Sequence, residues 1–178
     1  MIILGAWDEL DTEISVDVDT SDLDGLQSLD DPYGIFDDIA NYAVDLSEAV
    51  HNGSKRGVEE IAVRNRSFQQ QIIAEVCDNP SGMLASSIQE EEGNNGYTFI
   101  VGTILNHIYP MSVEYGRSEV YPVRAKALAF YLNGELVFRK SVGRAEPRPF
   151  VAPAYEKTDD IAEELMLIEV NHAIAEID

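Results

Sequence analysis

The sequence predicts an α+β fold: a small antiparallel sheet of about four strands, with a central Asn-Gly hairpin, packed by two N-terminal helices and a C-terminal helix. Apolar residues recur at helical spacing in residues 35–76 and again after Pro153. Shorter runs typical of strands occupy much of the region between them. Asn133-Gly134 is the strongest turn signal, because this pair suits the positive φ angles of a type I′ turn.

The length of 178 residues suits one domain, and 45% apolar content is ordinary for a globular protein. We expect residues 1–30 to form an acidic N-terminal segment and residues 31–178 a single domain. Within the first segment, residues 13–19 alternate Ile14, Val16 and Val18 with mostly acidic residues, which predicts a short edge strand with one wet face.

Two helices are predicted before residue 78. Asp30-Asp31-Pro32 is a typical helix start, with acids at the positive end of the helix dipole and proline in the first turn. His51-Asn52-Gly53 predicts a break, after which Ser54 can cap a second helix. Pro153 is expected to open the last helix, which runs to about Ile177. That helix carries two apolar stripes, namely Ile161, Leu165, Ile168 and His172, and Leu167, Val170, Ile174 and Ile177.

Strands are predicted at residues 83–89 and 97–103, joined by the acidic loop 90–96, although residues 83–88 fit a helical turn equally well. An irregular loop over residues 105–123 follows, and then the hairpin. A two-residue turn pairs Leu132 with Glu135 and Tyr131 with Leu136. One face then carries Ala129, Tyr131, Leu136 and Phe138, and both faces are apolar near the turn. We expect a helix of the same chain to cover one face, and a second helix or a neighbouring subunit to cover the other.

The net charge of −21 is unevenly distributed. Residues 1–50 contain 14 acids and no Lys or Arg, whereas residues 109–157 contain eight bases against five acids. This balance excludes general affinity for nucleic acid and predicts an electrically polarised molecule. The dense carboxylates and scarce Lys also suggest a halophilic source, for which low salt should unfold the protein. Cys77 is the only cysteine, which excludes an intramolecular disulfide, and the start resembles neither a signal peptide nor a membrane span.

Candidate chemistry is weak throughout. Asp17-Val18-Asp19-Thr20 is reminiscent of an aspartyl phosphatase nucleophile, but two acids at this spacing are expected by chance here. An approximate calcium loop, whose first ligand is wrong, comprises Thr20, Asp22, Asp24, Gly25 and Asp31. The three histidines lack ligand spacing and Cys77 has no partner cysteine. We therefore predict no catalytic residue, no metal site and no cofactor.

Four segments, in order, resemble the tail-completion (head-to-tail joining, or neck) protein family of long-tailed phages and archaeal tailed viruses. They are Pro80-Ser81-Gly82-Met83-Leu84-Ala85-Ser86-Ser87-Ile88, Ile108-Tyr109-Pro110-Met111-Ser112-Val113-Glu114-Tyr115-Gly116, residues 122–141, and Arg148-Pro149-Phe150-Val151-Ala152-Pro153-Ala154. The last is the most specific. Ser81 stands where threonine is usual, Arg117 replaces a small residue, and the segment before Ile35 has no counterpart.

The resemblance implies a non-enzymatic virion protein that forms a homo-oligomeric ring between a head connector and the tail tube or terminator proteins. DNA passes through that ring without specific binding, in the neck or tail of a virion assembled in the host cytoplasm, and no membrane is involved. Our hypothesis for the subunit interface is that bases face acids of the neighbour and Phe150 anchors the loop in an apolar pocket; it comprises Tyr115, Gly116, Arg139, Lys140, Arg144, Arg148, Pro149 and Phe150. A second hypothesis lines the channel with Glu90, Glu91 and Glu92.

Three alternatives stay open. A tail terminator or minor capsid protein shares the ring symmetry and differs in its position on the particle. A cellular acidic binding module would place the apolar last helix in a partner's groove. A metal-dependent hydrolase is the remotest.

Overall fold

The computed structural model describes residues 2–7, 11–21, 37–77, 82–93, 95–106, 108–132 and 134–177. In chain order the elements are β1 (Ile2–Trp7), β2 (Asp11–Val16), α2 (Asp37–Val76), α3 (Met83–Ser86), β3 (Ile88–Glu92), β4 (Thr98–Thr103), α4 (Ile108–Glu114), β5 (Leu128–Leu132), β6 (Glu135–Arg139) and α5 (Val151–Ala175). The α+β class is confirmed. The predicted helix start at Asp30-Asp31-Pro32 lies outside the described residues, as does most of the calcium-like stretch.

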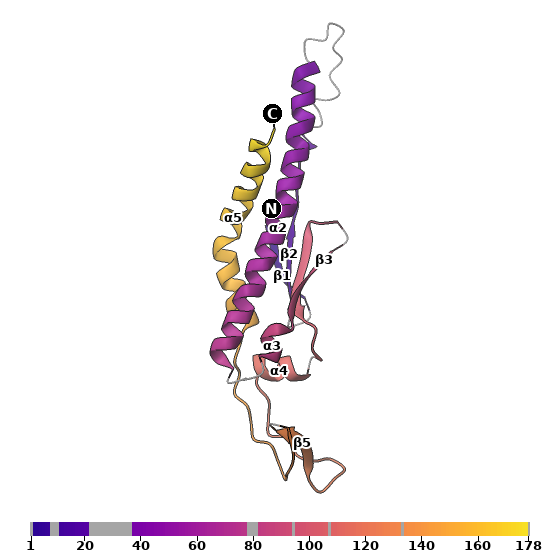
Figure 1. Ribbon diagram of the computed structural model, residues 1–178, viewed down its shortest axis with the longest axis vertical. Helices are drawn as coiled ribbons and strands as arrows, with labels where there is room; N and C mark the ends of the chain where they lie inside the picture. Colours follow the sequence, from indigo (N-terminus) through magenta and orange to yellow (C-terminus); the bar gives the residue numbers. More distant parts are fainter. Residues whose placement is uncertain are drawn as a thin grey trace.

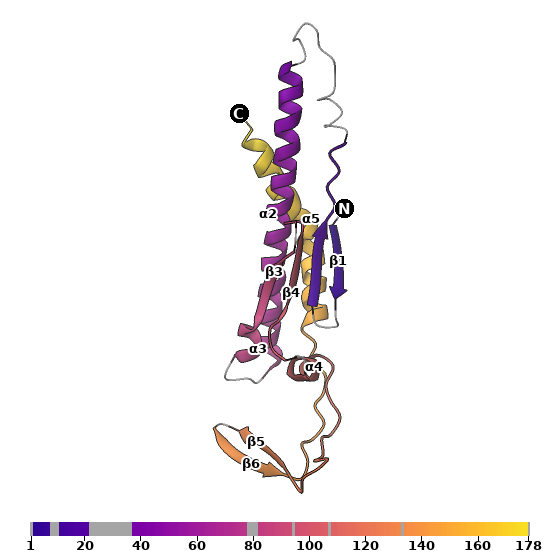
Figure 2. The ribbon, with the colours of Figure 1, turned by 90° about the vertical axis from the view of Figure 1, so that its right-hand side faces the viewer.

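The main sheet is antiparallel and has the order β1-β2-β4-β3 within the described residues. The long helices α2 and α5 lie side by side over one face of it, and no helix or strand of the described residues covers the other face (Figures 1 and 2). The edge position predicted for residues 13–19 is wrong, because β2 pairs with β1 on one side and with β4 on the other. Thr12 and Ile14 are buried under the helices, so the strand does alternate as its sequence indicated.

Helix α2 is continuous over 40 residues, or about 60 Å at 1.5 Å per residue. The predicted break at His51-Asn52-Gly53 and the cap at Ser54 are therefore wrong. A β-carbon on Gly53 would lie 2.7 Å from Cα of Val170 on α5, and one on Gly57 would lie 2.6 Å from Sδ of Met166. These glycines allow the two helices to approach closely, and the packing energy outweighs the poor helix propensity of glycine.

Helix α5 begins two residues before Pro153 and ends near the predicted residue, so its existence and extent are confirmed. Neither predicted apolar stripe forms its buried face, and Leu167 and Ile168 are exposed. The buried residues are mostly small, because the helix packs tightly on α2; they are Val151, Ala154, Thr158, Ala162, Met166 and Ala173.

A buried polar network crosses the seam between α2 and α5. The amide of Asn65 donates to Oγ1 of Thr158 at 3.0 Å, and the amide of Gln69 donates to Oδ1 of Asn65 at 2.8 Å. The Thr158 hydroxyl donates in turn to the carbonyl oxygen of Ala154 at 2.8 Å. Asn65, Gln69 and Thr158 are fully buried, so these bonds replace water and oppose sliding of one helix along the other.

The second half of the chain departs from the prediction in two places. Met83–Ser86 forms the helical turn that was one of the two alternatives, and β3 and β4 follow as a strand pair. Glu90, Glu91 and Glu92 belong to β3 rather than to a loop, because they pair with Val101, Ile100 and Phe99 of β4. The segment predicted as an irregular loop contains α4.

The hairpin has the predicted register, with Leu132 opposite Glu135, Tyr131 opposite Leu136 and Ala129 opposite Phe138. Gly134 has a φ of 84°, as its place in the turn requires. The predicted central position in the sheet is wrong, since β5 and β6 form a separate two-stranded sheet. Figure 2 shows this sheet beyond α3 and α4, away from α2 and α5, so no helix described here covers it.

Candidate subunit interface

Residues 115–150 are here called the arm, and the rest of the chain is called the body. The arm leaves the body after α4 and returns to it at the start of α5. The outgoing and returning strands are held together by isolated bridges between Arg117 and Ala145 and between Val120 and Val142, with N···O distances of 2.9–3.0 Å. The β5–β6 hairpin forms the far end (Figures 1 and 2). The arm contains all eight residues of the predicted interface.

The root of the arm is held by the carboxylate of Glu114. Its Oε2 accepts hydrogen bonds from the backbone N–H of Phe150 at 2.7 Å and of Val151 at 3.2 Å. Glu114 is buried, and Phe150 is the N-cap of α5 without a side-chain cap of its own. A carboxylate from 36 residues away thus satisfies the first donors of the helix and complements its dipole.

Two of the segments quoted in the sequence, Ile108–Gly116 and Arg148–Ala154, meet at this point. Glu114 belongs to one and Phe150 to the other, and the N–H of Arg148 donates to the carbonyl oxygen of Val113 at 2.7 Å. The role of Glu114 was not predicted from the sequence. The available signal was a glutamate beside an apolar motif, together with a helix start that lacks a capping side chain.

Phe150 is not an anchor for a neighbouring subunit. Its side chain is fully buried in the chain's own core, together with Leu84 and Ile61. A side chain packed in its own core is not available to a pocket of a neighbouring subunit. The motif that contains Phe150 attaches the arm to the body, while Arg148 and Pro149 beside it are exposed.

Gly116 sits where the arm leaves α4, with a φ of 73°. A β-carbon there would lie 2.6 Å from the carbonyl oxygen of Ala145, so any other residue would force the two strands apart. The neighbouring Tyr115 is 52% exposed. Gly116 therefore shapes the arm, and Tyr115 is accessible to a partner.

One face of the hairpin is apolar and uncovered. Tyr131 is 74% exposed, Phe138 61% and Leu136 51%, and the register places all three on the same face with Ala129. Isolated two-stranded sheets are marginal in water, and large exposed aromatic side chains in one patch mark interaction sites. The residues of this face were not among the eight of the predicted interface, but they lie beside Arg139, which was.

The arm also carries most of the positive charge. It contains seven basic residues against three acidic ones, a formal charge of +4, so the rest of the chain carries −25. Arg139 and Lys140 are exposed at the end of β6. Arg144 already pairs with Glu146 at 3.1 Å, although a pair this exposed contributes little stability. Arm and body are thus oppositely charged.

A polar contact crosses the arm between its two strands. Hydrogen bonds from the side chains of Ser141, which has the larger effect, and Tyr121 hold the pKa of Glu119 below its ordinary value of 4.5. The same bond to the Glu119 carboxylate, together with its charge, raises the pKa of Tyr121 above its ordinary value of 10.0. Both side chains are exposed, so water screens this contact and it contributes little stability.

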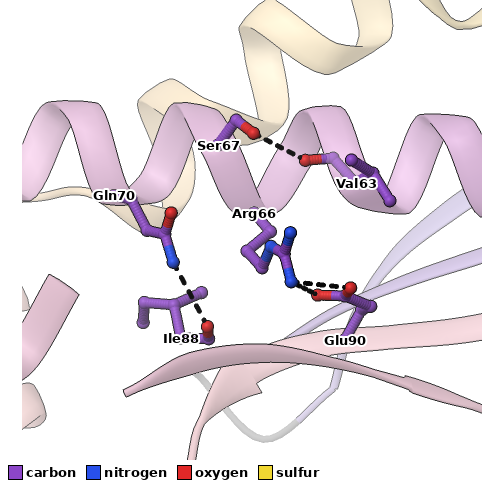
Figure 3. Close-up of polar contacts among 6 residues, drawn as sticks. All are labelled: Val63, Arg66, Ser67, Gln70, Ile88 and Glu90. Atoms are coloured by element: carbon purple, nitrogen blue, oxygen red, sulfur yellow. Dashed lines mark hydrogen bonds and ion pairs between the residues drawn. The ribbon is translucent and has the colours of Figure 1, made fainter. Parts of the chain in front are cut away.

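The three glutamates proposed to line a channel differ in their surroundings. Nη1 of Arg66 lies 2.7 Å from the carboxylate of Glu90, which places Glu90 against α2 (Figure 3). In the same view the amide of Gln70 donates to the carbonyl oxygen of Ile88 at 3.4 Å, and Ser67 donates to the carbonyl oxygen of Val63. Glu91 and Glu92 are exposed. The channel-lining hypothesis stays untested, and its negative charge would come from Glu91 and Glu92.

Other polar residues singled out in the sequence have local partners. Nε2 of His51 lies 3.2 Å from Oγ1 of Thr20, and its Nδ1 lies 2.8 Å from the hydroxyl of Tyr97. Hydrogen bonds from the Ser21 hydroxyl and then from the Ser21 backbone N–H, at 3.0 Å, lower the pKa of the Asp19 carboxyl group. Among the described residues no three His, Cys, Asp or Glu side chains are placed to hold a metal ion. None of the helices in the described ranges is long and apolar enough to cross a bilayer.

No protein-family model, curated protein or solved structure matches this chain significantly.

Proposed function

We propose that this protein is a structural, non-enzymatic virion component that forms a ring at the head-to-tail junction. The ring completes the tail, joins it to the head connector and leaves an open channel for DNA. The observation that carries the proposal is the arm, which presents an uncovered apolar face and a charge of +4 on a chain that is otherwise strongly acidic.

A ring requires two different contact surfaces on each subunit, because a head-to-tail contact closes only by rotation. The basic, apolar arm supplies one surface and the acidic body offers the other. Opposite potentials steer such contacts and suppress contacts between two bodies. Partners above and below the ring would be an adaptor or stopper of the head connector and the tail-tube or terminator proteins.

The acidity of the body suits passage of DNA, because carboxylates at the channel wall keep phosphates from adhering. It also suits a halophilic host, in whose cytoplasm the ring would be added to the virion. The two explanations make different predictions for Glu91 and Glu92. Neutralising both should slow genome ejection only if they line the channel.

The test is gold labelling of virus particles from the source organism with an antibody against this chain, viewed by electron microscopy. Label at the head-to-tail junction is the expected result, with antibody pre-absorbed on the purified protein as the control. Label at the tail end or on the capsid would overturn the neck assignment in favour of a terminator or minor capsid protein. Unlabelled particles would overturn the virion role and favour the cellular binding module.

A further inference from the structure

The bare face of the main sheet contains a groove beside its β3 edge. Asp11 of β2, Glu91 of β3, Ile100 of β4 and Ile104 line it. Gly102 lies in its floor, and the Asp11 side chain occupies the place that a β-carbon on Gly102 would take. Figure 2 shows this side of the sheet turned toward the viewer, with both long helices behind it.

The groove combines exposed apolar surface with negative charge. Ile104 is 69% exposed, and Glu91 is exposed on the edge strand. Opposite β4, β3 has no partner strand among the described residues. The exposed isoleucine suits an apolar side chain of a ligand, and the carboxylates beside it suit basic side chains. The groove therefore matches a ligand whose apolar residues are flanked by basic ones.

The hairpin at the end of the arm has that composition. Leu136 and Phe138 lie on its uncovered face, and Arg139 and Lys140 continue β6 directly after them. The chain's own hairpin lies beyond α3 and α4, away from the sheet (Figures 1 and 2). The matching hairpin must therefore come from another molecule.

We propose that the groove receives the hairpin of a second copy of this chain. Leu136 and Phe138 pack on Ile100 and Ile104, while Arg139 and Lys140 face Glu91 and Asp11. Charge complementarity indicates that the occupant is a second copy of this chain. Two bodies of charge −25 repel each other, whereas the basic arm of one copy is attracted to the acidic body of another. This inference rests on the proposed ring, and it names the surfaces that close it.

The test uses size-exclusion chromatography with light scattering, at a salt concentration where circular dichroism shows a folded chain. The arm variant is Phe138→Ser with Arg139→Glu, and the groove variant is Ile104→Ser with Glu91→Lys. The matched control makes the same kinds of change on the outer surface of α5, as Ile168→Ser with Glu164→Lys. We expect an oligomer for the wild type and the control, and the single-chain mass of 19.7 kDa for both other variants.

Mixing distinguishes a head-to-tail contact from a symmetric one. The groove variant retains a working arm and the arm variant a working groove, so an equimolar mixture should give one-to-one dimers and nothing larger. A mixture that stays at the single-chain mass would mean that the arm of one copy does not bind the groove of another, and would overturn the inference. Assembly by the groove variant alone, or a single-chain wild type, would overturn it equally.

Cross-linking provides a second measurement that needs no disruptive change. In a Cys77→Ser background, Phe138→Cys with Ile104→Cys should give a ladder of oxidised multimers, whereas Phe138→Cys with Ile168→Cys should not. Equal ladders would refute the pairing. The proposed function is tested separately by particle labelling, so a neck protein that closes through other surfaces would fail here and still label the junction.

Discussion

Replacing Gly53 with alanine tests the packing of α2 on α5. In an exposed helix this change stabilises by about 1 kcal/mol. Here the added β-carbon would lie 2.7 Å from Cα of Val170, 3.0 Å from the carbonyl oxygen of Glu169 and 3.1 Å from Cβ of Ala173. Two of these atoms are backbone, so relief requires the helices to separate. Overpacking of this kind costs about 1–3 kcal/mol, which outweighs the gain in propensity.

The net loss in the free energy of unfolding for Gly53→Ala is then up to about 2 kcal/mol, or up to roughly 8 °C in melting temperature, as measured by circular dichroism at fixed salt. Asn52→Ala is the matched control, because Asn52 is exposed on the same turn and alanine there should stabilise slightly. If Gly53→Ala raised the melting temperature as much as the control does, the close approach of the two helices would be refuted.

Three further outcomes are expected. Phe150→Ala should destabilise the folded chain by about 3–5 kcal/mol in urea unfolding, since a fully buried ring leaves a cavity, and an unchanged midpoint would place the ring outside the core. Thr158→Val keeps the shape but leaves the buried Asn65 amide without its acceptor, and should cost about 1–3 kcal/mol by the same assay; a neutral result would contradict the network. Ser141→Ala should raise the pKa of Glu119 toward 4.5 in an NMR titration. Because that pKa is depressed in the folded chain, the contact stabilises the arm above the ordinary pKa and is lost as pH falls through the lowered value; an unmoved pKa would exclude the Ser141 bond.

The sequence predicted those elements whose signals are local. Asn133-Gly134 determines its own pairing, so the hairpin register was predictable to the residue. Pro153 likewise indicated the start of the last helix, because its fixed φ and missing N–H favour the first turn of a helix.

The elements that were missed depend on residues far apart in the chain. A glycine can end a helix, or it can allow two helices to approach closely. Gly53 has the second role because Val170 of α5 packs against it, and the local sequence does not show this contact. The buried face of α5 is formed by small residues, so the larger Leu167 and Ile168 misled a prediction based on hydrophobicity.

The surface of the arm was predictable in part. Charge pointed to Arg139 and Lys140, and the turn register placed the apolar residues of the hairpin on one face. The segment Arg148 to Ala154 suggested Phe150, whose burial depends on how the root of the arm folds onto the rest of the chain, and it gave no indication that Glu114 bonds the start of α5. Side chains that face solvent can be recognised by pattern, whereas those that join distant segments cannot.

The arm enters and leaves the body side by side, and this makes it a replaceable module. Arg117 and Ala145 are paired, and Glu114 and Phe150 are bonded, so the body already holds the two ends together. The length of chain between them adds little to the entropy of closing that loop, since each doubling costs only about 0.6 kcal/mol. Mutations, insertions or deletions between residues 118 and 144 can therefore change the exposed surface of the hairpin without altering the core. That surface and the core are encoded in separate stretches of this chain, and each can diverge while the other is retained.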